Sequence, residues 1–323
     1  MLPDPPGFSS CGEYVEASIS TWLQLGGRRV DSSASYHNQL YTGIAMAASG
    51  IPRADLFLTS KVGPFLAMGG AEAELQFAHT LGVMNTTYVD LVLIHWPTCA
   101  SGGGCSGAPT SEPTCQAGTA GYDERACRLA TWRALVAIWG RGGARAIGVS
   151  NYNQTHLQEI MDAGLPLPAV NQLPFNLYHS GDLGNGLFDF MRAHNVRVCV
   201  CGGGGRAPLP PPAHAACRAR SSPPPLRPRA QITYNTYSPF AVPDRRSYKP
   251  PMARTPLEDP VLAGIAAAHG TSPAQATLAW QWARGMVFNP RSQNAAHMLQ
   301  NLAFEGILLS EAEVAALDAR PQY

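Results

Sequence analysis

The chain has 323 residues, of which 45% are hydrophobic and 14% charged, enough to bury a large core in one α/β barrel or two ordinary domains. Its formal net charge of +1, with basic residues scattered, excludes a strong electrostatic footprint for nucleic acid or an anionic membrane. No apolar stretch approaches the roughly 18 to 20 residues that span a bilayer, and the opening MLPDPPGFSS lacks signal-peptide features. We therefore expect a cytoplasmic protein whose partner is a small molecule.

The eight cysteines are expected to be free thiols, because a long chain without a secretion signal seldom holds disulfides. Four of them are spaced too loosely, and without paired histidines, to match a zinc site. These four are Cys99, Cys105, Cys115 and Cys127. We expect no metal in the protein.

Short apolar runs recur along the chain, each followed by a segment with helical periodicity, which is the pattern of repeated βα units with a parallel sheet. The predicted strands are 28–33, 56–61, 88–95, 145–150, 169–175, 232–238 and 286–290. The predicted helices lie near 12–25, 39–48, 72–82, 124–140, 154–163, 183–194, 259–269, 273–284, 294–302 and 310–319. Ser272 with Gln275, and Ser310 with Glu313, have the spacing of capping boxes that start two of these helices.

Two stretches interrupt this alternation within a single domain that spans residues 1–323. Residues 98–122 are rich in Gly, Ser and Thr and are too long for an ordinary connection, which predicts a loop insertion over the catalytic face. Residues 201–230 are a Gly, Pro and Arg tract with almost nothing to bury, which predicts a disordered insertion.

Four ionisable side chains, Asp31, Tyr36, Lys61 and His95, lie at or just past the ends of predicted parallel strands. In an α/β barrel the carboxyl ends of the strands form the catalytic face, so the four are expected to converge on one proton-transfer site. A tyrosine pKa of about 10 is too high for an efficient acid at neutral pH, and the Lys61 ammonium is expected to lower it. Asp31 would hold Lys61 charged, and a neutral His95 would orient a carbonyl oxygen. Taken singly, each residue also has an ordinary structural explanation.

The same residues carry a resemblance to a known family. Asp31, then Tyr36 with Asn38 two residues on, then Lys61 in LTSKV and His95 in LIHWP, resemble the aldo-keto reductase pattern from about residue 12 to 320, the two insertions apart. The resemblance implies a (β/α)8 TIM barrel and an oxidoreductase. It further implies that an aldehyde or ketone is reduced to an alcohol by hydride transfer from NADPH, with Tyr36 as general acid.

Three departures from the family pattern are visible. The family's first strand, with its Gly-x-Gly-Thr turn, has no counterpart before residue 12, so a complete barrel and a barrel without its first strand both stay open. Ser33 stands where the family usually has Ala, and Gln39 stands where it usually has Glu.

The resemblance also implies a set of cofactor residues. Polar groups at two strand ends would bind the nicotinamide carboxamide, and an aromatic ring at a third would stack on the nicotinamide. These are Ser150, Asn151 and Gln172 for the carboxamide and Tyr237 for the ring, and Ser238 is a further cofactor-binding residue. The segment 289–301 resembles the adenosine-phosphate segment through Arg291, Ser292, His297, Gln300 and Asn301. Arg291 can clamp a 2′-phosphate whereas His297 is a weaker partner, so NADPH is favoured and NADH stays open.

Phe65 and Trp96 follow Lys61 and His95 closely, so they either line an apolar cleft for a small-molecule carbonyl substrate or fill the core. Two other functions are weighed beside the enzyme. One is a catalytically weak, nicotinamide-binding regulatory subunit of the same fold, and the other is a truncated, non-functional family member. In each case we expect a monomer or weak oligomer.

Overall fold

The computed structural model describes residues 9–63, 68–98, 112, 115, 120–180, 185–194, 233–240 and 255–321, with side chains described for all of these except 9–13, 233–235 and 237. The predicted insertion 201–230 lies outside the described residues, as does most of the insertion 98–122.

Seven parallel strands form one curved sheet in the described part of the chain, and they lie side by side in the order of the sequence. The strands are β1 (Arg29–Asp31), β2 (Phe57–Val62), β3 (Val89–Ile94), β4 (Ala144–Ser150), β5 (Val170–Pro174), β6 (Thr233–Tyr237) and β7 (Val287–Asn289). All seven strand predictions are confirmed to within about two residues. Sequential parallel order is what repeated βα units produce when each helix crosses over the same face.

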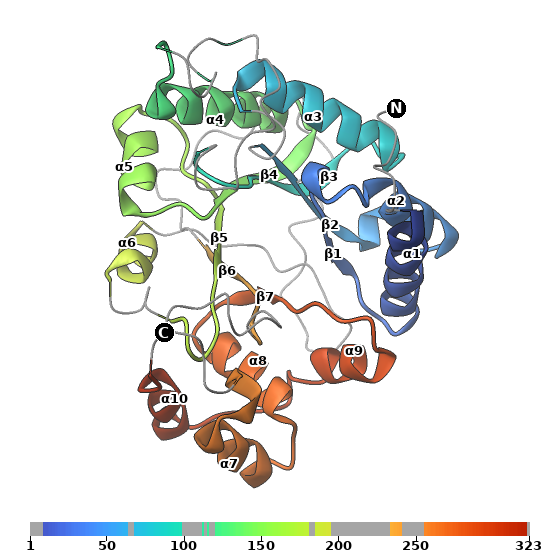
Figure 1. Ribbon diagram of the computed structural model, residues 1–323, viewed down its shortest axis with the longest axis vertical. Helices are drawn as coiled ribbons and strands as arrows, with labels where there is room; N and C mark the ends of the chain where they lie inside the picture. The colour runs from blue at the N-terminus through green and yellow to red at the C-terminus, as the bar shows by residue number, and fades with distance from the viewer. Residues whose placement is uncertain are drawn as a thin grey trace, which may run out of the picture.

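Helices cover the outer side of this sheet and form a ring around it (Figure 1). The α-helices are α1 (Ser9–Gln24), α2 (Gln39–Ala48), α3 (Gly70–Val83), α4 (Glu124–Gly140), α5 (Gln154–Asp162), α6 (Leu187–Ala193), α7 (Pro260–Ala268), α8 (Pro273–Ala283), α9 (Ala295–Leu302) and α10 (Glu311–Asp318). Short 3-10 turns occur at η1 (Ala34–Tyr36), η2 (Arg53–Asp55) and η7 (Pro256–Glu258). All ten predicted helices are confirmed. None of those described is long and apolar enough to cross a bilayer.

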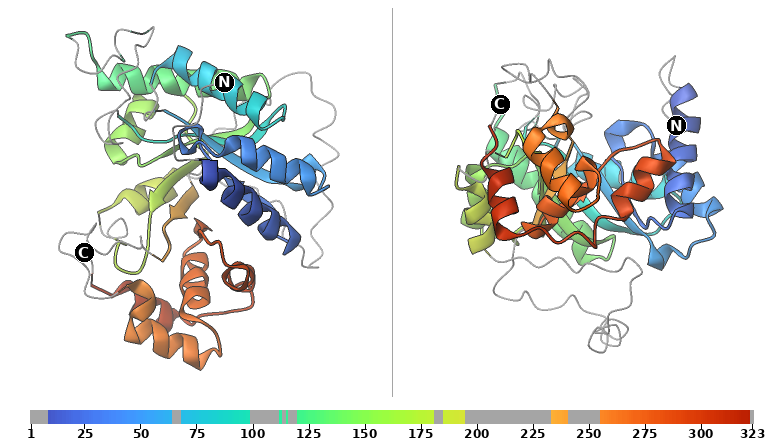
Figure 2. Two further views of the ribbon diagram at one scale, coloured as in Figure 1. Left: turned by 45° about the vertical axis from the view of Figure 1, so that its right-hand side comes forward. Right: turned by 90° about the horizontal axis from the view of Figure 1, so that it is seen from below.

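The two edges of the described sheet, β1 and β7, are linked by contacts between helices rather than by strand pairing. Within the described ranges no strand pairs with the outer edge of β1 or of β7, so the sheet is an open α/β barrel there. Helix α9, which follows β7, contacts α1, which precedes β1 (Figure 2). Helices α9 and α1 are therefore in contact at the place where the described strands β7 and β1 do not pair.

Local sequence signals explain where helices begin. Both predicted capping boxes are present, with the side chains of Ser272 and Ser310 accepting from the backbone N–H groups of Gln275 and Glu313. In each box the third helical residue reaches back to the capping residue, which satisfies backbone donors that a helix start leaves open.

The core has an outer and an inner layer. The outer layer, between sheet and helices, includes the fully buried rings of Trp132 and Trp280. The inner layer, inside the curve of the sheet, contains Leu91, Leu93 and Val170. At Gly148 an added Cβ would lie 2.6 Å from the carbonyl oxygen of Val170, so the inner layer requires a glycine at this position. Strand residues alternate between the two layers, as the pleat dictates.

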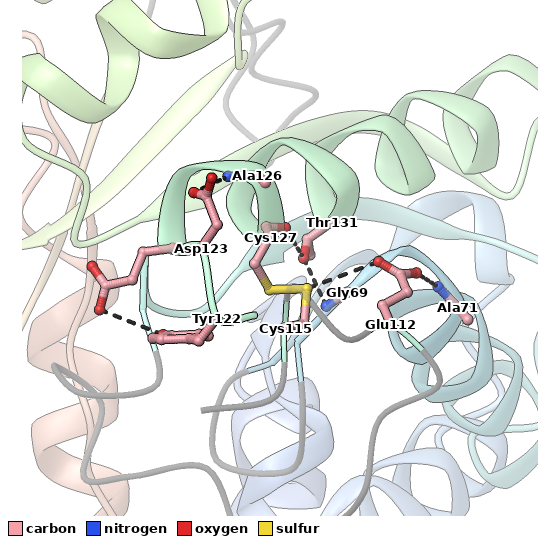
Figure 3. The surroundings of a disulfide bond; sticks show 10 residues. Gly69, Ala71, Glu112, Cys115, Tyr122, Asp123, Ala126, Cys127 and Thr131 are labelled. Carbon is pink, nitrogen blue, oxygen red and sulfur yellow. Dashed lines mark hydrogen bonds between the residues drawn. A yellow bond between two sulfur atoms is a disulfide. The ribbon is translucent and has the colours of Figure 1, made fainter. Parts of the chain in front are cut away.

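The expectation of free thiols is wrong for one pair of cysteines. Cys115 and Cys127 form a disulfide, with their Cα atoms 5.0 Å apart (Figure 3). Cys127 lies in the first turn of α4, and Glu112, three residues before Cys115, accepts a hydrogen bond from the Ala71 N–H at the start of α3. The disulfide therefore joins the segment before α4 to α4 itself, beside the start of α3.

Candidate active site

Parallel pairing places the predicted catalytic residues at one edge of the sheet. Asp31 is the last residue of β1, Lys61 lies near the end of β2, and His95 directly follows β3. The register aligns Asp31 with Thr59, and Lys61 with Leu93. Since the three strands run in the same direction side by side, their ends present these side chains to a common space.

The Lys61 ammonium is the buried charge of the site. Lys61 is 1% exposed, forms an ion pair with Asp31, and donates to the carbonyl oxygen of Ser32 at 3.1 Å. Burial lowers the pKa of Lys61, but Asp31 and then Tyr36 raise it, and the net pKa lies above the ordinary value. Lys61 is therefore charged at neutral pH, held by the Asp31 carboxylate as expected for a buried cation with a partner.

Tyr36 reaches this edge through the short turn η1. His37, with a left-handed φ of 54°, ends the turn; Tyr36 is 43% exposed as a whole residue, while its hydroxyl makes a partly buried contact with His95. The Tyr36 hydroxyl lies 3.3 Å from His95 Nε2, and the Lys61 ammonium lies 5.0 Å from the centre of the Tyr36 ring. Burial raises the pKa of Tyr36 and Lys61 lowers it, with a net increase above the ordinary value. Lys61 thus acts in the expected direction, but the expected net lowering is not found because burial outweighs it.

His95 is a neutral imidazole at physiological pH. Burial, and after it the Lys61 charge, lower the pKa of His95 to about 3. Its ring meets the Tyr36 ring edge to face at 5.3 Å, and two hydroxyl oxygens approach its other nitrogen. Ser33 Oγ lies 3.1 Å and Ser35 Oγ 3.3 Å from His95 Nδ1.

Two of the three predicted carboxamide-binding residues are hydrogen-bonded to catalytic residues, and the third is hydrogen-bonded to these two. Gln172 Nε2 donates to Asp31 Oδ2 at 2.9 Å, and Ser150 Oγ donates to the Gln172 carbonyl at 2.7 Å. Asn151, which follows β4 in a left-handed conformation with φ 63°, donates to the His95 carbonyl at 2.9 Å. The structure thus brings Ser150, Asn151 and Gln172 into one network with Asp31 and His95.

The predicted phosphate-binding segment, residues 289–301, runs from the last residue of β7 into α9. Arg291 is exposed and follows two residues after Asn289, the last residue of β7, whose Nδ2 lies 3.4 Å from Asp31 Oδ2. Ser292 Oγ accepts from the Asn294 N–H at 3.1 Å, and His297 is exposed in the first turn of α9. Two more predicted residues follow in α9: Gln300 accepts from Ser272 Oγ at 3.3 Å, and Asn301 is buried.

A cavity of about 480 Å³ opens at the ends of β4 and β5, and Trp96 and Asn151 are among the residues that line it. Trp96 therefore faces a space rather than filling the core. Phe65 lies outside the described residues. Tyr237 ends β6 opposite Pro174 and Asn289, but its side chain lies outside the description, and the next residue, Ser238, has a left-handed φ of 52°.

Comparison with known proteins decides the family. A family model described as Aldo/keto reductase family matches residues 10–320. The chain belongs to the aldo/keto reductase family. Morphine 6-dehydrogenase of Pseudomonas putida is 29% identical over 314 residues, which cover 96% of this chain and 84% of the relative. Aldo-keto reductase family 1 member A1 of Cricetulus griseus is 29% identical over 310 residues, or 94% and 81% of the two chains.

Solved structures agree with this aldo/keto reductase assignment. An aldo/keto reductase from Brucella melitensis is 25% identical and superimposes with a TM-score of 0.66, covering 95% of this chain and 90% of that one. MGS-M4, an aldo-keto reductase from a deep-sea metagenome, superimposes with a TM-score of 0.70, covering 96% of this chain and 87% of that one. Because its sequence is only 21% identical, this match supports the fold alone. The family resemblance predicted from the strand-end residues is confirmed, and family membership indicates an oxidoreductase that acts on carbonyl compounds.

Sequence reasoning missed three side chains of this aldo/keto reductase site. Asn289 Nδ2 lies 3.4 Å from Asp31 Oδ2, so β7 supplies a further donor to the Asp31 carboxylate. Ser33 and Ser35 contact His95, which lies about sixty residues further along the chain. The departure of Ser33 from the family's usual Ala was the one signal that pointed to it.

Proposed function

We propose that the protein reduces an aldehyde or ketone to an alcohol with NADPH, and that Tyr36 donates the proton to the carbonyl oxygen. The observation that carries this proposal is the meeting of a tyrosine, a buried ammonium, a carboxylate and a neutral imidazole at one edge of a parallel sheet. A phenol that gives its proton to a reacting oxygen acts as a general acid, and the fixed positive charge beside it stabilises the phenolate that remains. Positioned side chains act in this way in many enzymes.

The protonation states of the site suit this role. Because the pKa of Tyr36 is raised, the phenol carries its proton at neutral pH, as a donor must. Lys61 stabilises the phenolate that remains after the proton has left, and Asp31 keeps Lys61 charged and aimed. His95, neutral at this pH, can hydrogen-bond the carbonyl oxygen through Nε2 and bring it next to the Tyr36 hydroxyl, 3.3 Å from that nitrogen.

The residues at the neighbouring strand ends fit a nicotinamide dinucleotide. When bound, NADPH supplies the hydride that goes to the carbonyl carbon. Ser150, Asn151 and Gln172 present amide and hydroxyl groups beside Asp31 and His95, where the carboxamide would be held. The side chain of Tyr237 would stack on the ring.

At the adenosine end, the exposed Arg291 guanidinium and the start of α9 offer a clamp for the 2′-phosphate, which favours NADPH over NADH. Ser292 and His297 would add polar contacts to the same phosphate. Gln300 is the better placed of the two predicted adenine partners, because Asn301 is buried.

The substrate would approach from the cavity that Trp96 lines. Trp96, the residue after His95, gives this cavity an aromatic wall, which suits a carbonyl compound with a hydrophobic group. The test is oxidation of NADPH and NADH by the purified protein in the presence of aromatic aldehydes, aldoses and 1,2-dicarbonyls. Consumption of NADPH with at least one of these classes is expected. Tight NADPH binding without consumption across the whole panel would favour the regulatory subunit instead.

A further inference from the structure

Two serine hydroxyls converge on one nitrogen of the His95 ring. Ser33 Oγ lies 3.1 Å and Ser35 Oγ 3.3 Å from Nδ1, and the two oxygens are 3.0 Å apart. Ser33 is fully buried and caps the turn η1, where its oxygen accepts from the Ser35 N–H, so its position is rigid. The family usually has Ala at the position of Ser33, so the hydroxyl there is a feature of this chain.

The contacts among His95 Nδ1, Ser33 Oγ and Ser35 Oγ limit how the protons of these three groups can be arranged. His95 is neutral, so its ring carries one N–H, on either Nδ1 or Nε2. If Nδ1 is bare, it accepts from one serine, and the second serine can donate to the first. If Nδ1 carries the proton, the ring donates to a serine and Nε2 is bare. The two tautomers are not equivalent: Ser33 Oγ already accepts from the Ser35 N–H, so a bare Nδ1 offers the Ser33 proton an acceptor, whereas an Nδ1–H would be a second donor to the same oxygen. The contact on the other side of the ring favours the same tautomer.

On the other side of the ring, the Tyr36 hydroxyl lies 3.3 Å from Nε2. The Lys61 ammonium lies 5.0 Å from the centre of the Tyr36 ring, and its positive charge attracts the lone pairs of the phenol oxygen and repels the phenol proton. A bare Nε2 would draw the phenol proton toward the imidazole and away from a substrate. An Nε2–H would instead donate to the phenol oxygen or to a carbonyl, and would leave the Tyr36 proton to point into the open site.

We propose that Ser33 and Ser35 are positioning residues that donate to His95 Nδ1 and so hold the ring in the Nε2–H tautomer. In this arrangement the Nε2–H can donate to the carbonyl oxygen or, without substrate, to the phenol oxygen, and the Tyr36 proton is directed at the substrate. The inference rests on the proposed function for its purpose, but the tautomer itself is measurable without turnover. The proposal adds two hydroxyl groups that orient the imidazole to the residues that act on the substrate.

The test is nitrogen NMR of protein labelled with ¹⁵N-histidine, in which the shifts of the two ring nitrogens identify the tautomer. His95→Gln assigns the His95 signals among the nine histidines. The wild type is expected to carry its proton on Nε2. The double variant Ser33→Ala with Ser35→Ala should shift the tautomer ratio toward Nδ1–H by roughly two- to tenfold, the range of an ordinary hydrogen bond. It should lower kcat by a similar factor and leave the Kd for NADPH unchanged.

Two further variants separate this role from a general loss of packing. Ser35→Thr keeps the hydroxyl at a half-buried position and should retain the wild-type ratio. Ser32→Ala removes a neighbouring hydroxyl that donates to Asn38 and should leave the His95 signals unchanged. An equal shift in Ser32→Ala would overturn the inference.

The tautomer of His95 in the wild-type protein can be measured even if none of the variants folds, so the wild-type spectrum tests the inference on its own. A wild-type His95 with its proton on Nδ1 would refute the role of the serines, even in an enzyme that reduces carbonyls well. A wild type that holds Nε2–H but oxidises no NADPH would contradict the proposed function and leave the role of the serines supported.

Discussion

The depressed pKa of His95 makes the stability of the protein depend on pH. The folded-state pKa of His95 is about 3, against an ordinary value of 6.5. Between these values the unfolded chain binds a proton that the folded protein does not, so acid favours unfolding. The contribution is fully present above pH 6.5 and is lost as the pH falls toward 3. Between pH 8 and pH 5 the loss from this one group amounts to about 2 kcal/mol.

The variant His95→Gln isolates this effect, because glutamine is polar but does not titrate. The free energy of unfolding would be measured by equilibrium urea titration, followed by tryptophan fluorescence, for wild type and variant at pH 8 and at pH 5. The wild type is expected to lose about 2 kcal/mol more than the variant over this interval. Other titrating groups contribute equally to both proteins and cancel in the difference. Equal losses would refute the buried, neutral state of His95 on which its role as a hydrogen-bond partner of the carbonyl depends.

Three other substitutions test separate parts of the structure. Lys61→Met removes the charge that stabilises the Tyr36 phenolate, so kcat/KM for carbonyl reduction should fall by about a hundredfold or more in steady-state assays, and a near-normal value would contradict the assignment. Arg291→Ala removes the proposed phosphate clamp, so the Kd for NADPH should rise by about tenfold or more while that for NADH changes little, as measured by fluorescence titration; equal changes would count against this clamp. Cys127→Ser breaks the disulfide with Cys115, which is twelve residues away, so calorimetry should show a loss of about 3 kcal/mol, and an unchanged Tm would contradict a stabilising disulfide.

The sheet and the catalytic residues at its edge were predictable because both depend on local patterns. Each strand is a short apolar run, and the periodicity of the following segment identifies a helix, so the ends of β1, β2 and β3 could be located within about two residues. Once the strands are parallel and sequential, Asp31, Lys61 and His95 must share one edge.

Other features depend on distances that the sequence does not contain. Cysteine count and spacing do not fix a pairing, because the disulfide depends on a fold that brings the Cα atoms of Cys115 and Cys127 to 5.0 Å from each other. The sign of the Lys61 effect on Tyr36 follows from charge alone, whereas the net pKa depends on how deeply the phenol is buried.

The hydrogen bonds of the site show the same limit. Gln172 matches a cofactor residue by its motif, yet its amide reaches Asp31 on a strand 141 residues earlier in the chain. At Gln39 the amide replaces the family's usual Glu and still finds partners, since it donates to Ser60 Oγ and accepts from Thr80 Oγ1. A neutral side chain suits this buried position, where a carboxylate would need a balancing charge.

The central claim is that the Tyr36 phenol delivers the proton to the carbonyl, and Tyr36→Phe tests it most directly. The variant keeps the ring and removes only the hydroxyl, so NADPH binding should match the wild type in a fluorescence titration. The rate of NADPH oxidation with the best carbonyl substrate should fall by about a thousandfold, within the range of a lost general acid. A Tyr36→Phe protein that binds NADPH normally and reduces the carbonyl at a near wild-type rate would contradict this account.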